Sequence, residues 1–323
     1  MNRYVSASGT LALAAMLAAC GDTGGSGRAA GAADSTAGDS APETAAAPKK
    51  VGEIRVNAPE AVRYDPELDV WYVASFGEGE VSPLGKDNNG FIGRYKADGS
   101  ADSVKFVAGG RGGAVLNAPK GMAIVGDTLW VADIDAVRGF NRRTGAPVAT
   151  VNVRGAKFLN DVAVGPDGAL YLTDSGLGPD PKTGLGHPGP DRLYRVGADR
   201  KATVALEDSS LAAPNGIAWD SAGRSFVVAP FFGQQMMRWT PGDSALQPLA
   251  SGKGQQDGVE PIGNGRLLVT SWTDSSLNVV EHGQWTRLTG GVPSAADLGW
   301  DGKRRHAAVP LLMEGRVEIW EVP

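Results

Sequence analysis

Six short segments of the sequence resemble one another, and their middle residues could form one polar site. The segments are Pro59-Glu60-Ala61, Pro119-Lys120-Gly121, Leu159-Asn160-Asp161, Pro214-Asn215-Gly216, Gln256-Asp257-Gly258 and Ala295-Ala296-Asp297. The middle residues include two carboxylates, Glu60 and Asp257, and two carboxamides, Asn160 and Asn215. Such an all-oxygen, doubly negative set suits one hard divalent cation, with Ca²⁺ ahead of Mg²⁺, Mn²⁺ or Zn²⁺. The segments therefore predict a metal site, provided that the fold brings them together.

Turn formation is the alternative explanation for these polar residues. Asn and Asp favour turns because their side chains bond to nearby backbone, so some of the set could be incidental. Glu60 is not a typical turn residue, and all four residues occupy the same position of the repeat. This shared position favours the cation site over the turn explanation.

The elements that must position these residues are short strands. Each segment is followed by an alternating apolar run, a turn and a second run, as in Ile217-Ala218-Trp219, residues 220–223 and Ser225-Phe226-Val227-Val228. Repeats of about 40–50 residues made of short strands are typical of propeller blades. We predict an all-β, six-bladed β-propeller. The strand at residues 53–56 precedes the first segment and should join the last blade, closing the ring.

Composition excludes several classes of protein. The chain has 323 residues, of which 46 are Gly and 20 are Pro, and no helical periodicity interrupts the strands. Its net charge is −5, and it has no Lys/Arg cluster, so we expect no nucleic-acid partner. The 3 His residues lack metal-ligand spacing. A closed ring has no edge that must pair, so we expect a monomer.

The first fifty residues carry a targeting pattern. Residues 1–19 contain one Arg and a short apolar run, as in a secretory signal. Leu17-Ala18-Ala19-Cys20-Gly21 resembles a bacterial lipobox, which predicts a lipid on Cys20, the chain's 1 Cys, and attachment to a membrane. An ordinary signal peptide with a chance Cys is the alternative.

The remaining division of the chain follows from this pattern. Residues 20–50 form the lipidated Cys and a linker predicted to be disordered, and residues 51–323 form the propeller. We expect the protein in the bacterial cell envelope, facing the periplasm. By resemblance to the lipoprotein sorting rule, Gly21 indicates the outer rather than the inner membrane.

Loops between the second and third strands should surround the site. Their first residues are mostly large and apolar: Phe76, Ile134, Ser175, Phe231, Trp272 and Leu311. Packing between blades could explain any one of them, but as a set they predict a small-molecule substrate with an apolar portion. The two long loops, at residues 77–90 and 176–190, could serve as lids. His187 in the second loop is a candidate substrate contact or proton shuttle.

The repeated segments resemble the SMP-30/gluconolactonase/LRE-like family of six-bladed propellers. The resemblance implies that Glu60, Asn215 and Asp257 are direct metal ligands, with Asn160 a ligand or substrate contact. Phe158 stands where sugar-lactonase members place Arg, which argues against a sugar lactone. Lys120 is also unexpected at its position. It could bind an anionic substrate, or it could instead pair with Asp161 or Asp297 and have no chemical role. Asp161 is also a candidate substrate contact.

The resemblance implies a divalent-metal-dependent hydrolase of lactone or ester-like substrates. Asp257 is the candidate base and, with Asn160, the candidate catalytic residue. The alternative function is a non-catalytic propeller lipoprotein that binds a ligand or protein partner in the cell envelope.

Overall fold

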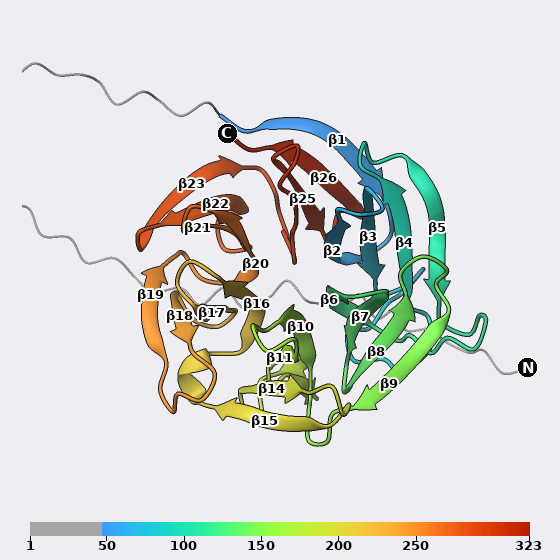
Figure 1. The fold of residues 1–323 in the computed structure, drawn as a ribbon, viewed down its shortest axis with the longest axis horizontal. Helices are drawn as coiled ribbons and strands as arrows, with labels where there is room; N and C mark the ends of the chain where they lie inside the picture. The colour runs from blue at the N-terminus through green and yellow to red at the C-terminus, as the bar shows by residue number, and fades with distance from the viewer. Residues whose placement is uncertain (1–46) are drawn as a thin grey trace, which may run out of the picture.

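The six repeats fold as six four-stranded antiparallel sheets arranged around a central axis (Figure 1). The structure is a computed structural model and describes residues 47–323. The predicted signal peptide, lipidated Cys20 and most of the linker lie outside the described residues. The prediction of an all-β, six-bladed propeller is confirmed.

Each blade starts with a strand next to the axis and proceeds outward. Blade 1 comprises β2 (Pro59–Asp65), β3 (Val70–Ser75), β4 (Phe91–Lys96) and β5 (Ala101–Ala108). Blade 2 comprises β6 (Pro119–Val125), β7 (Thr128–Asp133), β8 (Ala136–Asn141) and β9 (Pro147–Asn152). Blade 3 comprises β10 (Leu159–Val164), β11 (Leu170–Asp174), β14 (Arg192–Val196) and β15 (Ala202–Glu207).

The second half of the ring repeats this order. Blade 4 comprises β16 (Pro214–Asp220), β17 (Ser225–Pro230), β18 (Gln235–Trp239) and β19 (Gln247–Ser251). Blade 5 comprises β20 (Gln256–Gly263), β21 (Arg266–Ser271), β22 (Ser276–Glu281) and β23 (Gln284–Gly290). Blade 6 comprises β24 (Gly299–Asp301), β25 (His306–Leu311), β26 (Arg316–Glu321) and β1 (Lys49–Arg55).

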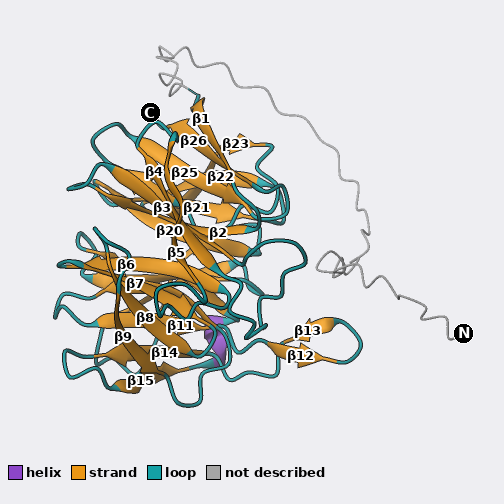
Figure 2. Cartoon of the chain, turned by 90° about the vertical axis from the view of Figure 1, so that its right-hand side faces the viewer, coloured by secondary structure: helices purple, strands orange, loops and turns teal. Residues whose placement is uncertain are grey.

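Two small elements interrupt this pattern. A hairpin of β12 (Gly178–Asp180) and β13 (Gly184–Gly186) projects from one face of the propeller (Figure 2). A single 3₁₀ turn, η1 (Ser209–Leu211), precedes blade 4. Among residues 47–323, no helix has the length and apolar character needed to cross a membrane.

The N-terminal strand closes the ring as predicted. β1 pairs antiparallel with β26, with Ile54 opposite Val317 and Arg55 opposite Arg316. The strand begins at Lys49 rather than at residue 53, so two residues assigned to the linker belong to the blade. Lys50 is held there by Glu318, whose Oε1 lies 2.8 Å from its Nζ. This closure pairs the free edge of β26 and removes a site for edge-to-edge aggregation.

The core lies between neighbouring blades. Tyr72 of β3, for example, is fully buried and belongs to the same apolar cluster as Met122 and Leu129 of blade 2. Burying each such side chain contributes about 1.5–3 kcal/mol. Equivalent clusters join the other blades, so the strands next to the axis are held in fixed positions.

The innermost strands are irregular where the predicted site residues lie. In blades 1 to 5 the pairing register shifts at the repeated segment, for example between Pro59 and Ala61 and between Gln256 and Val259. A bulge removes a residue from the regular alternation and redirects its side chain. The strands also approach closely: a Cβ on Gly216 would lie 2.4 Å from the carbonyl oxygen of Asp257. Glycine is therefore required beside that site residue.

Candidate functional site

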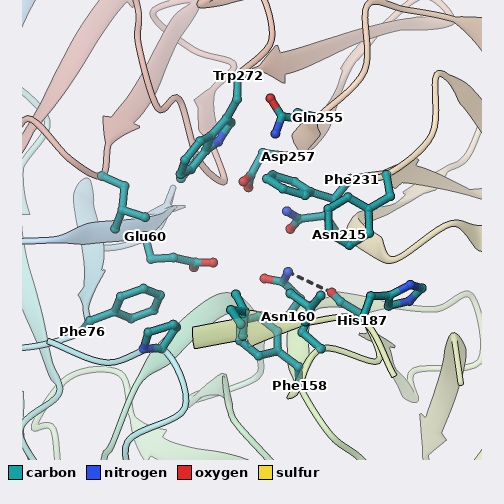
Figure 3. Close-up of a pocket in the computed structure, with 18 of the residues that line it drawn as sticks. Glu60, Phe76, Phe158, Asn160, His187, Asn215, Phe231, Gln255, Asp257 and Trp272 are labelled. Carbon is teal, nitrogen blue, oxygen red and sulfur yellow. Dashed lines mark hydrogen bonds between the residues drawn. The ribbon is translucent and has the colours of Figure 1, made fainter. Parts of the chain in front are cut away.

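The four predicted metal ligands line one cavity of about 300 Å³ at the mouth of the central channel. Glu60, Asn160, Asn215 and Asp257 come from β2, β10, β16 and β20, and their polar ends point toward a common centre (Figure 3). The bulges described above place them there. The arrangement thus brings together side chains that are up to 197 residues apart in the chain, as the span from Glu60 to Asp257 (257 − 60) shows.

Three oxygens of this set are buried without a hydrogen-bond partner among the described residues. They are Glu60 Oε2, Asn215 Oδ1 and Asp257 Oδ1. A buried carboxylate oxygen without a partner is costly, and a cation satisfies it. Oxygen donors from two carboxylates and a carboxamide fit Ca²⁺ or a similar hard cation. Within residues 47–323, no group of three His, Cys, Asp or Glu side chains is placed to hold a metal ion. The set described here contains two such residues, Glu60 and Asp257, and its other oxygens come from carboxamides.

The amide of Asn160 is oriented by Ser175. Asn160 Nδ2 donates to Ser175 Oγ at 3.0 Å, and Ser175 Oγ in turn donates to the Pro214 carbonyl at 2.6 Å. This chain directs the Asn160 carbonyl oxygen into the cavity (Figure 3). Sequence reasoning placed Ser175 only on the rim and missed this contact, because the partner carbonyl belongs to the next blade.

Thr173 holds the backbone of Asn215 through the main-chain carbonyl. Its hydroxyl accepts from the Asp161 backbone N–H at 2.9 Å and donates to the Asn215 carbonyl at 2.6 Å. Thr270 repeats this arrangement, accepting from the Gly258 N–H and donating to the Ala296 carbonyl. The sequence signal was present, since both Thr residues occupy equivalent positions on the second strand of their blades.

The electrostatics of the cavity favour protons or a cation. Burial raises the pKa of Asp257 to about 8, and the charge of Asp161 adds to this rise, while Asn215 and Trp272 oppose it. Burial and the charge of Asp257 raise the pKa of Glu60 well above its ordinary value, and Lys120 opposes that rise. Without a cation, these carboxyls therefore retain protons at pH values where exposed carboxyls are ionised. A metal that binds there displaces protons.

A second polar layer lies outside the cavity. Asp161 Oδ2 accepts from the Ile217 backbone N–H at 2.8 Å, and burial raises the Asp161 pKa to about 6. Arg63 of β2 pairs with Glu260, and its Nη2 lies 3.8 Å from Asp297 Oδ2. Sequence reasoning missed Arg63 and Glu260 because their pairing depends on how blades 1 and 5 are positioned around the axis.

Two predicted substrate contacts, Lys120 and Asp161, do not line the cavity. Asp161 is occupied by the Ile217 contact. Lys120 is fully buried, and its Nζ lies 4.2 Å from the centre of the Phe158 ring and 5.3 Å from that of Phe76. The two rings cover it on the cavity side, so the structure places neither residue where a substrate would touch it.

The rim of the cavity is apolar, as the loop residues predicted. Phe76, Phe231 and Trp272 line it, and the Phe231 and Trp272 rings meet edge to face with centroids 5.7 Å apart. Further apolar lining residues are Pro83, Phe158, Leu177, Leu185, Phe232 and Leu312. Leu311 was expected on the rim, but it ends β25 and packs in the core of blade 6. Its neighbour Leu312 takes that place, and Ile134 is buried away from the cavity.

Both long loops contribute to the cavity wall. Pro83 comes from the loop at residues 77–90, and Leu185 and His187 come from the β12–β13 hairpin and the residue that follows it. His187 Nε2 lies 2.6 Å from Asp191 Oδ1, and its ring meets Phe232 edge to face at 5.4 Å. Asp191 fixes the imidazole at the rim, where a bound molecule would meet it.

Comparison with known proteins finds one family model that matches the middle of the chain. Residues 88–238, slightly less than half of the 323 residues, match the model of the SMP-30/Gluconolactonase/LRE-like region. The matched part runs from the loop before β4 to the penultimate residue of β18, and it includes Asn160 and Asn215. The resemblance inferred from the repeated segments is thus confirmed. No curated protein matches the chain in sequence.

Solved structures share the fold of this chain at low identity. A gluconolactonase from Xanthomonas campestris is 16% identical, with a TM-score of 0.61, over 89% of this chain and 99% of that one. A luciferin-regenerating enzyme is 16% identical, with a TM-score of 0.59, over 84% and 94%. Virginiamycin B lyase from Staphylococcus aureus is 11% identical, with a TM-score of 0.56, over 85% and 100%. At these identities, the likeness concerns the fold alone.

Proposed function

We propose that this protein is a divalent-cation-dependent hydrolase of lactones or similar esters that carry an apolar substituent. The observation that carries the proposal is the convergence of Glu60, Asn160, Asn215 and Asp257, three of them with unpartnered buried oxygens, beneath an apolar rim. A bound cation, Ca²⁺ in our proposal, would polarise the ester carbonyl and acidify water. The family-model match over residues 88–238 and the fold shared with a gluconolactonase support this class of reaction.

The residues around the cavity would have distinct tasks. Glu60, Asn215 and Asp257 would hold the cation, and Asn160, oriented by Ser175, would hold the cation or the substrate carbonyl. Asp257 would accept a proton from the attacking water as oxygen attacks the carbonyl carbon. It would return that proton to the ring oxygen when the carbon–oxygen bond breaks.

The rim indicates what kind of substrate fits. Phe158, Phe231 and Trp272 would pack against an alkyl or aryl group, and His187 would contact the substrate at the entrance. No Arg or Lys lines the cavity, so an anionic substrate would find neither of these cationic side chains to pair with there. An apolar substituent gains about 25 cal/mol for each Å² that it buries.

Calorimetry and a substrate panel test this proposal. The metal-stripped protein is titrated with Ca²⁺, Mg²⁺, Mn²⁺ and Zn²⁺, and hydrolysis is measured for alkyl-substituted lactones, aryl esters and gluconolactone. We expect Ca²⁺ to bind below millimolar concentration and chelator to abolish hydrolysis of the apolar lactones. A protein that binds no cation, or that hydrolyses none of the panel, contradicts the proposal. Cation binding without hydrolysis would instead indicate the non-catalytic ligand-binding module.

We also propose that the chain is a lipoprotein of the cell envelope. The support is the segment Leu17-Ala18-Ala19-Cys20-Gly21, which resembles a lipobox. Lipidation would tether the propeller to the outer membrane, with the cavity facing the periplasm. Expression in a bacterium supplied with labelled palmitate should label the wild-type chain but not a Cys20→Ser variant. Equal labelling of both would overturn the proposal.

A further inference from the structure

Lys120 is a buried cation placed beside the proposed metal site. It follows Pro119 at the start of β6, at the same position of the repeat as Glu60 and Asp257. Its side chain is fully buried, and Nζ donates to the carbonyls of Ala118 at 3.0 Å and Pro83 at 3.4 Å. The Phe158 and Phe76 rings lie on its cavity side. A fully buried lysine is rarely found without a negatively charged group that pairs with it.

The carboxylate that Lys120 can balance is Glu60. Burial lowers the pKa of Lys120 to about 8, and the charges of two carboxylates, Glu60 and Asp133, oppose that fall. Asp133 is fully engaged, since its oxygens accept from the backbone N–H groups of Asn117 and Ala118 and from Arg138. Glu60 instead has an oxygen without a partner that faces the cavity. The charge of Lys120 is therefore directed at the metal site.

We propose that Lys120 is a built-in counter-charge that sets the affinity of the cavity for its cation. This inference rests on the proposed cation site. With no cation bound, the charge of Lys120 opposes the protonation of Glu60 that burial favours. With a divalent cation bound, Lys120 repels it, and the site binds more weakly than its oxygen ligands alone would allow. The Phe158 and Phe76 rings exclude water from the space between Lys120 and the cavity, so the repulsion between Lys120 and the cation is poorly screened.

A neutral variant distinguishes this role from a purely structural one. In Lys120→Met the repulsion is lost, so calorimetry should show Ca²⁺ binding about tenfold tighter, or more, than in the wild type. Ca²⁺ binding also displaces a proton from the carboxyls, and Lys120 repels that proton too. The divalent cation carries twice the charge of one proton, so the neutral variant still gains affinity when one proton is displaced. The matched control is Lys201→Met, which removes one charge at an exposed position that contacts only Asp199 among carboxylates. We expect the control to bind Ca²⁺ as the wild type does.

Stability gives a second readout that does not depend on turnover. One saturating concentration of Ca²⁺ should raise the melting temperature of Lys120→Met by more than it raises that of the wild type, because the variant binds the cation more tightly. Lys120→Gln, which keeps a donor for the two carbonyls, covers a failure of the Met variant to fold in chelator. Unchanged or weaker Ca²⁺ binding in a folded neutral variant overturns the inference. So does failure of both variants to fold even in saturating Ca²⁺.

These outcomes are separable from those of the proposed function. A wild-type protein that binds Ca²⁺ and hydrolyses lactones, with no tightening in Lys120→Met, loses only the inference about Lys120. Tight binding in Lys120→Met by a protein with no hydrolytic activity retains that inference and overturns the proposed function.

Discussion

Strand β2 carries a buried carboxylate at each end, and the two are held in opposite ways. Asp65, at its outer end, is fully buried and accepts from the backbone N–H groups of Glu67 and Leu68 and from Arg142. Glu60, near its beginning, is 6% exposed and has an oxygen with no partner. Burial is therefore common to both, and hydrogen bonding separates them. A carboxylate whose partners are complete serves the fold, whereas one left incomplete at a cavity is available to a ligand.

The largest effect should come from removing the charge of Asp257, the carboxylate on β20 that has an oxygen without a hydrogen-bond partner. Asp257→Asn keeps the shape of the side chain but loses the proposed base and a cation ligand. We expect turnover of an apolar lactone to fall by about 10³-fold or more, measured as initial rates in Ca²⁺. Circular dichroism should show an unchanged fold. Activity within tenfold of the wild type would erase the distinction between the two kinds of carboxylate.

Substitution of Asp65, whose hydrogen-bond partners are complete, should lower the stability of the protein instead. Asp65→Ala removes the buried partner of Arg142, which keeps only the more exposed Glu67 and Asp127, and leaves two backbone N–H groups unpaired. We expect the free energy of unfolding, from urea denaturation, to fall by about 3–5 kcal/mol. Ca²⁺ affinity and turnover per folded molecule should not change. A loss of Ca²⁺ binding in folded Asp65→Ala would show that the two ends of the strand are not independent.

The pH dependence of stability should also separate the two regions. Burial raises the pKa of Asp257 to about 8 and that of Asp161 to about 6, from an ordinary value of 3.8. The folded state therefore binds more protons than the unfolded state between these values, and stability is lost as pH rises. In chelator, we expect the melting temperature to fall from about pH 4 to pH 8. Saturating Ca²⁺ should reduce this fall, because it replaces the protons; an equal fall with and without Ca²⁺ would argue against a cation at these carboxyls.

The smallest effect should follow from loosening a supporting contact. Ser175→Ala removes the acceptor that orients the Asn160 amide, so Ca²⁺ affinity measured by calorimetry should weaken by about 10-fold. Ser271→Ala is the matched control, since its buried hydroxyl donates to the Gly254 carbonyl and contacts no proposed ligand. Equal weakening in both variants would indicate a general effect of packing rather than orientation of Asn160.

Much of the fold could be predicted from the sequence. The repeated segments and the alternating runs are local signals, and they indicated six blades and the strand that closes the ring. The same repeat located Glu60, Asn160, Asn215 and Asp257, because equivalent residues of successive blades lie at the same height around the axis. The one-residue error at Leu311 arose because the repeat does not show where β25 ends.

Pairing between blades could not be predicted in the same way. Arg63 and Glu260 are 197 residues apart, and their contact depends on how blades 1 and 5 face each other across the axis. Lys120 was expected to contact substrate, yet the packing of Phe158 and Phe76 separates it from the cavity. No periodic signal records such contacts.

The sequence by itself determined the number of blades, the closing strand and the positions of the polar residues, since these follow from periodicity along the chain. Only the tertiary structure decided which polar atoms are satisfied. Asp161 acquired a backbone donor from the next blade, whereas Glu60 and Asp257 kept oxygens without partners at the cavity. The physical reason is that hydrogen-bond partners are set by distances between strands far apart in the chain, and those distances exist only once the ring has closed.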